Sequence, residues 1–175
     1  MNKLYPIAAA VVTAFSIAPA QASTIAAHER LVTAVQRTGV TIQLNTKECV
    51  GASFAGYYRS SAGRMVICQD NGIDGSNQQA RWTANDLDTL RHESHHLSQD
   101  CIATGIGDNS LGTIYVKPFA FAQQYFGTVV IRNIMANYKE RGAPEHVQIL
   151  EVEAFAVAEM NNPDQQVRDL EKYCL

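Results

Sequence analysis

The chain has 175 residues, of which 46% are hydrophobic and 18% are charged. This composition excludes a disordered chain, a collagen-like repeat and a disulfide-dense miniprotein, and the length suits one domain. Acidic side chains number 17 against 14 basic ones, for a formal charge of −3. The chain therefore has no broad basic surface, which argues against nucleic acid as a partner.

Residues 1–22 have the pattern of a secretory signal peptide. Lys3 gives a positive start, an apolar run covers residues 5–18, and Ala20-Gln21-Ala22 is an A-x-A cleavage pattern. An uncleaved membrane anchor is the alternative, but the apolar run is short for a span of about 20 residues. We predict export to the periplasm or the medium, and a single mature domain over residues 23–175 with no stable membrane span.

The four cysteines all lie in the predicted mature chain, and an oxidising compartment favours their pairing as disulfides. Four cysteines allow three connectivities. We favour Cys49–Cys68, which closes a local hairpin, and Cys101–Cys174, which ties the carboxyl-terminal tail to the core. Each bond would stabilise the domain by about 2–4 kcal/mol. A thiolate metal site is the competing interpretation, and it is disfavoured because the chain has no C-x-x-C pair.

Hydrophobic patterning along the mature chain predicts an α+β domain with a small mixed sheet. Apolar residues at helical spacing predict a first helix over about residues 26–37. Short apolar runs separated by turn residues predict three strands, over 40–44, 52–58 and 64–68. The polar loop over residues 69–79 lacks the full calcium-loop pattern and is predicted to be a plain turn. Three longer helices are expected over 84–101, over 121–139, and from Pro144 to about Met160.

The helix that begins at residue 84 has clear start signals and carries the motif H-E-x-x-H. Thr83 is a good N-cap, and Asp86 stands where a capping box needs it. Within the motif, His92 and His96 are one helical turn apart, so both imidazoles can bind one metal ion. Glu93 lies beside them and can take a proton from a water molecule that the metal binds. A histidine-rich, solvated helix face without metal is the alternative reading.

A third histidine, His95, occupies a variable position of the motif and points about 100° away from His96 around the helix, so we expect it to lie behind the ligands or at the surface. Two histidines are too few for a zinc site, and a third ligand is required. In the helix after Pro144, Glu153 lies on the most apolar face, where an unpartnered carboxylate is costly and metal coordination would remove the cost. An arginine partner or a protonated carboxyl would remove it too. The other candidates are His28, Glu145, His146, Glu151 and Glu159.

H-E-x-x-H followed by a helical glutamate resembles the gluzincin metallopeptidases. The segment Glu153–Ala158 is similar to the E-x-F-A stretch of MtfA-like and anthrax-lethal-factor-like peptidases. The resemblance implies a zincin-like fold, in which the sheet packs on the H-E-x-x-H helix and further helices carry the third ligand. It also implies zinc as cofactor and Glu153 as that ligand. These families place a tyrosine seven residues before the glutamate. Here that position is His146, so His146 or Tyr138 would stabilise the oxyanion.

The sequence thus predicts an exported zinc metallopeptidase that acts on peptide or protein substrates, with zinc held by His92, His96 and Glu153 and with Glu93 as general base. The strand over 64–68 would be the edge that pairs with an extended peptide, as in similar enzymes. One alternative is a catalytically silent zincin-like protein that binds metal or a partner. Another is a zinc hydrolase that acts on a cell-wall amide. The sequence indicates no oligomeric state.

Overall fold

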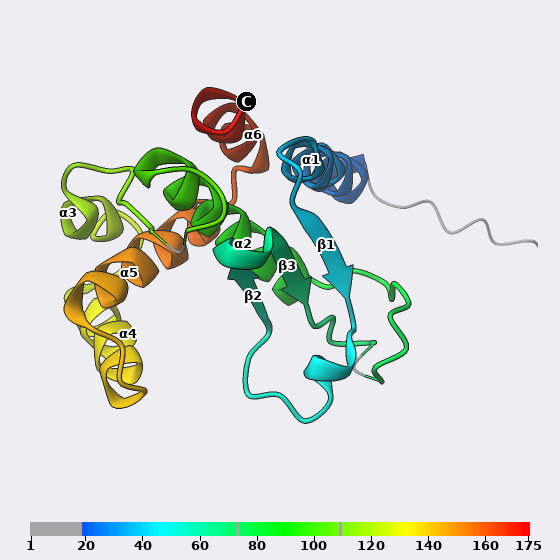
Figure 1. Ribbon diagram of the computed structural model, residues 1–175, viewed down its shortest axis with the longest axis horizontal. Coiled ribbons are helices and arrows are strands. Elements are labelled where there is room, and N and C mark those ends of the chain that lie inside the picture. The colour runs from blue at the N-terminus through cyan, green and yellow to red at the C-terminus, as the bar shows by residue number, and fades with distance from the viewer. Residues whose placement is uncertain (1–18, 73, 109) are drawn as a thin grey trace, which may run out of the picture.

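The computed structural model of the chain describes residues 19–72, 74–108 and 110–175. Residues 1–18 of the predicted signal peptide lie outside the described residues. The described residues form an α+β domain, as predicted (Figure 1). Its elements are α1 (Pro19–Arg37), β1 (Thr41–Leu44), η1 (Lys47–Cys49), β2 (Gly56–Arg59), η2 (Ser60–Ala62), β3 (Arg64–Ile67), α2 (Ala84–Ala103), α3 (Pro118–Ala122), α4 (Thr128–Glu140), α5 (Glu145–Met160) and α6 (Pro163–Tyr173).

In the described part of the chain the sheet has the strand order β1-β3-β2. Strands β1 and β3 fall within predicted runs, and β2 ends one residue beyond its predicted run. Strand β3 pairs in parallel with β1 and antiparallel with β2. The prediction that residues 64–68 form an edge strand is therefore wrong, because β3 is the central strand and β1 and β2 are the edges. Burial gives the reason: Met65, Val66 and Ile67 are all fully buried, which is typical of a strand covered on both sides.

Helix α2 occupies the middle of the molecule, with the sheet and α1 on one side and α5 across it on the other (Figure 1). The predicted capping box at its start is present. The Asp86 carboxylate accepts a hydrogen bond from Thr83 N at 2.7 Å, and Thr83 Oγ1 accepts one from Asp86 N at 3.1 Å. From residue 89 to residue 100 every residue of α2 is buried, so its polar side chains need partners inside the protein.

The carboxyl-terminal half differs from the prediction in two places. The single helix expected over 121–139 is divided into α3 and α4, and Gly127 is the N-cap of α4. The division lets Phe121 of α3 and Ile131 of α4 pack in one cluster with Val152 of α5. Helix α6 was not predicted, although its start has two recognisable signals, the N-cap residue Asn162 and a proline directly after it.

Both predicted disulfides are confirmed. Cys49 and Cys68 join η1 to the end of β3, and Cys101 and Cys174 join the last turn of α2 to the end of α6. Disulfides are typical of proteins that fold in oxidising compartments, so the pairing is compatible with an exported protein. Among the helices of the described segments, none is long and apolar enough to cross a membrane.

Candidate metal centre

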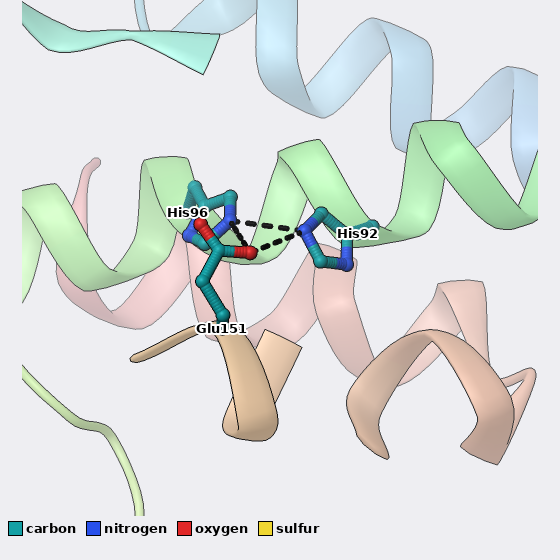
Figure 2. Close-up of side chains that lie close together, drawn as sticks. All are labelled: His92, His96 and Glu151. Atoms are coloured by element: carbon teal, nitrogen blue, oxygen red, sulfur yellow. Dashed lines mark hydrogen bonds and ion pairs between the residues drawn. The ribbon is translucent and has the colours of Figure 1, made fainter. Parts of the chain in front are cut away.

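The side chains of α2 and α5 meet where the two helices pack together. His92 and His96 lie one turn apart on α2, and Glu151 reaches them from α5 (Figure 2). Glu151 Oε2 is 3.1 Å from His92 Nε2 and 3.4 Å from His96 Nε2, and the two Nε2 atoms are 3.1 Å apart. The prediction that the two histidines of H-E-x-x-H converge is therefore confirmed, and the third member of the group is Glu151.

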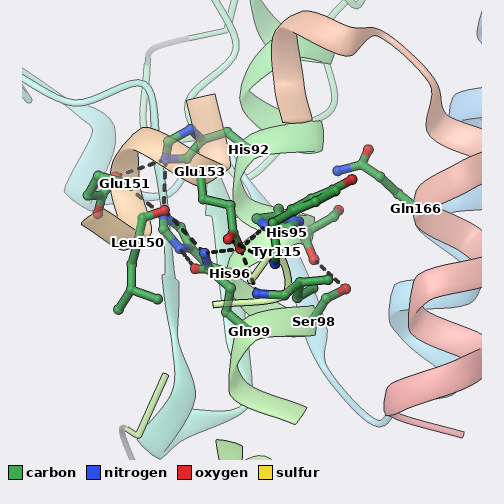
Figure 3. A network of polar contacts seen from close by, with 12 residues as sticks. His92, His95, His96, Ser98, Gln99, Tyr115, Leu150, Glu151, Glu153 and Gln166 are labelled. Carbon is green, nitrogen blue, oxygen red and sulfur yellow. Dashed lines mark hydrogen bonds and ion pairs between the residues drawn. The ribbon is translucent and has the colours of Figure 1, made fainter. Parts of the chain in front are cut away.

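Glu153 does not join this group, which corrects the position expected for it. Its side chain is fully buried, as the apolar helix face predicted, but it points to the other side of His96, toward His95 and Gln99 (Figure 3). The carboxylate accepts its hydrogen bonds from donors of the protein itself. They are His95 Nε2, Gln99 Nε2 and the main-chain amides of Ile114 and Tyr115, at 2.9–3.1 Å.

Electrostatics inside the group favour a positive charge at its centre. Burial alone would raise the pKa of Glu151, but His96 and His92 outweigh burial and hold that pKa well below its usual range. Burial alone would lower the pKa of His96, but Glu151 and Glu93 outweigh burial and raise it to about 9. Metal binding to imidazole ligands displaces their protons, so a divalent cation at this position would supply the positive charge that the group favours.

The spacing of the donor atoms fits zinc. A tetrahedral zinc ion with ligands at about 2.0–2.1 Å holds neighbouring ligand atoms about 3.3 Å apart. The three donor-to-donor distances here are 3.1, 3.1 and 3.4 Å. Two imidazole nitrogens and one carboxylate oxygen are also a common donor set of catalytic zinc sites, which leave one coordination position open. The residues present therefore fit the metal.

Glu93 lies beside the group, where the sequence predicted it. Its carboxylate is buried, and burial raises its pKa, while the charges of His92 and His96 act in the opposite direction. A raised pKa brings a carboxylate closer to the range in which it both accepts and returns a proton.

A cleft of about 270 Å³ opens beside His92 and Glu93. One wall is the segment Ser53–Gly56, which leads into β2, and the opposite wall is the end of α4 with Tyr138 and Arg141. Tyr138 lies near Glu151, and burial together with the Glu151 charge raises the pKa of Tyr138. Tyr138 therefore remains a neutral hydrogen-bond donor at the cleft.

His146 lies away from this cleft. It is exposed in the first turn of α5, beside Ser110 and Leu111, in a separate pocket of about 310 Å³. We expected His146 as a candidate for stabilising the oxyanion. Its position does not meet this expectation, because it lies more than one helical turn before Glu151 and does not line the cleft. Of the two candidates for oxyanion stabilisation, the structure brings Tyr138 and not His146 to the group.

His95 and Gln99 complete the surroundings of the group. His95 is buried and hydrogen-bonds to Glu153, so it lies behind the ligands and not at the surface. Sequence reasoning missed Gln99, whose Oε1 is 2.7 Å from His96 Nδ1. One signal could have found it: Gln99 follows His96 by three residues on the same helix, where side chains are neighbours.

The fold and the site thus define an α+β domain with a His/His/Glu group in position to hold a metal ion. The chain belongs to the family described as a domain of unknown function (DUF8637), whose model matches residues 23–175. This range is the same as that of the predicted mature domain. No curated protein and no solved structure matches the chain significantly.

Proposed function

We propose that the chain is an exported zinc-dependent metallopeptidase of zincin-like fold, with His92, His96 and Glu151 as the metal ligands. The observation that carries the proposal is the convergence of three donor atoms within 3.4 Å of one another, next to the buried carboxylate of Glu93 and a cleft. Zinc in such a site supplies Lewis-acid chemistry, which lowers the pKa of a water molecule and polarises a carbonyl group.

Glu93 is the proton carrier in this proposal. Its carboxylate lines the cleft beside His92, so it can accept a proton from the attacking water. The same carboxyl then returns the proton to the amine that leaves when the peptide bond breaks. Burial raises the pKa of Glu93, which favours acceptance of the proton, while the charges of His92 and His96 act in the opposite direction.

Tyr138 supports the developing oxyanion. Its side chain lies near Glu151 and lines the same cleft as Glu93. A phenol with a raised pKa stays protonated, so it can donate a hydrogen bond to a substrate carbonyl as negative charge grows there.

An extended peptide suits the shape of the cleft. The segment Ser53–Gly56 forms one wall and continues into β2, an edge strand of the sheet. A strand edge presents main-chain donors and acceptors to which a peptide substrate can pair. In this proposal β2 replaces residues 64–68 as the substrate-binding edge. The two disulfides support the periplasm or the medium as the site of action.

The test is the zinc content of the mature protein and of two alanine variants, measured by metal analysis after dialysis. Wild type is expected to hold one zinc per chain, Glu151→Ala to lose it, and folded Glu153→Ala to retain bound metal at reduced affinity. Circular dichroism serves to normalise each value to folded protein. Loss of zinc by Glu153→Ala alone would show that the ligand assignment is wrong.

Activity is tested separately on a broad peptide library with the zinc-loaded protein. Cleavage that disappears in Glu93→Gln, while zinc content is unchanged, supports the peptidase. Stoichiometric zinc without cleavage would favour a catalytically silent metal-binding protein. A wild-type protein that binds no zinc would overturn the proposal.

A further inference from the structure

We propose that Gln99 and Glu153 form a relay of positioning residues that fixes the ring of His96 for metal binding; this inference rests on the proposed function. The relay runs from Glu153 through the Gln99 amide to His96 Nδ1 (Figure 3). Neither Gln99 nor Glu153 contacts the metal position, so both would act through His96.

The orientation of the Gln99 amide follows from its surroundings. Its Nε2 lies 3.1 Å from the Leu150 carbonyl oxygen and 3.1 Å from Glu153 Oε1. Both neighbours are acceptors, and an amide nitrogen has two hydrogens to donate. The reversed orientation would place the Gln99 oxygen against two other oxygens, which is strongly unfavourable in a buried site. Gln99 Oε1 must therefore face His96.

This orientation determines which nitrogen of neutral His96 carries the hydrogen. Gln99 Oε1 is 2.7 Å from His96 Nδ1 and can only accept, so Nδ1 is the donor. The lone pair of neutral His96 is then on Nε2, the atom that faces Glu151 and His92. A partner of this kind orients a metal-binding imidazole and makes it more basic, and its loss typically weakens metal binding about 10- to 100-fold.

Glu153 is the fixed end of the relay. Its Oε1 accepts from His95 Nε2 at 2.9 Å, from Gln99 Nε2 at 3.1 Å and from Ile114 N at 2.9 Å, and its Oε2 accepts from Tyr115 N at 3.1 Å. Four donors from two separate segments, α2 and the loop before α3, hold the carboxylate in one orientation. The main-chain oxygen of Gln99 also accepts from Gly112 N at 2.9 Å, so the loop before α3 is tied to the same point. Glu153 thus couples the position of that loop to the zinc ligand His96.

The test compares zinc affinity, measured by competition with a chelator, in Gln99→Met, in Glu153→Gln and in the double variant. Gln99→Met keeps the size of the side chain but removes its amide, so its zinc affinity is expected to fall about 10- to 100-fold. If the two residues act in series, the double variant binds zinc about as weakly as Gln99→Met alone, because the relay is already broken. Additive losses would show two independent structural effects and would overturn the relay.

A matched control is Gln166→Met. Gln166 is also a buried glutamine that bonds to α2, through its Nε2 to the Arg91 carbonyl oxygen at 2.6 Å, but it does not contact His96. This variant should lose stability and keep wild-type zinc affinity. An equal loss in Gln166→Met and Gln99→Met would show a general effect of disturbing α2 and would overturn the relay.

A spectroscopic measurement separates positioning from stability. In the zinc-loaded wild type, the Nδ1 proton of His96 is expected to exchange slowly with solvent in nitrogen-15 NMR, and in Gln99→Met it should exchange fast while His92 is unchanged. Should Glu153→Gln not fold, Gln99→Met and this signal decide the question. Wild-type affinity in Gln99→Met would overturn the relay and leave the proposed function intact. Absence of zinc in wild type would overturn both.

Discussion

Removal of the Cys101–Cys174 disulfide is expected to destabilise the domain more than removal of Cys49–Cys68. The first bond joins residues 73 positions apart, and the second joins residues 19 apart. If a disulfide acts by restricting the unfolded chain, the longer loop contributes about 4.4 kcal/mol and the shorter about 3.2 kcal/mol at 25 °C. A loss of 4 kcal/mol is a large fraction of the total stability of an ordinary domain, about 5–15 kcal/mol.

The assay is equilibrium unfolding in urea of two double alanine variants, each lacking one disulfide, followed by far-ultraviolet circular dichroism. A chelator is present throughout, so that differences in bound metal do not contribute to the free energy of unfolding. Wild type measured with a reducing agent gives the effect of losing both bonds. The entropic reasoning is refuted if the Cys49–Cys68 variant is the less stable of the two, or if loss of Cys101–Cys174 costs under about 1 kcal/mol.

Three further changes test the fold around the site. Asp86→Ala removes the acceptor for the main-chain amides of Thr83 and Asp70, and it should cost about 3 kcal/mol in thermal or urea unfolding; a neutral result would contradict the cap. Gly56→Ala would place a methyl group 2.6 Å from Thr89 Cγ2 and 2.8 Å from the Val66 oxygen, so we expect a lower melting temperature, and an unchanged one would show that β2 is free to shift away from α2. His28 is buried, and burial lowers its pKa, so the unfolded chain binds a proton more readily than the folded one. The stability it contributes is complete above the unfolded pKa of about 6.5 and is lost as pH falls toward the folded value, by at most about 1.4 kcal/mol per pH unit. In metal-free protein this pH dependence should be weaker in His28→Gln, and equal slopes would refute the assignment.

Local signals in the sequence were sufficient for much of the fold. The capping box at Thr83, the proline before α5 and the turn residues between the strands are short-range features, and each was found where the sequence placed it. The division between α3 and α4 has a different origin. It depends on packing of both helices against α5, which a periodic apolar pattern over residues 121–139 does not contain.

The third member of the metal group shows why part of the site was not predictable. Position on the apolar face of α5 correctly indicated that Glu153 is buried, but burial does not identify the partner. The donors that satisfy Glu153 include two main-chain amides of the loop before α3, and main-chain amides leave no trace in side-chain patterns. Glu151 was one of the other candidates on the same helix, and its side chain proves to face His92 and His96 across the helix pair.

The central position of α2 has a consequence for how the domain opens. Its residues from 89 to 100 are buried on all sides, so its amide hydrogens can reach solvent only when the surrounding elements separate. Helix α4 has a single buried residue, Ile131, and its other packing side chains are half-buried. We therefore expect slower hydrogen exchange along α2 than along α4. The spacing of the two histidines thus depends on the most buried helix of the described chain, whereas Tyr138 of the cleft wall lies on a less buried one.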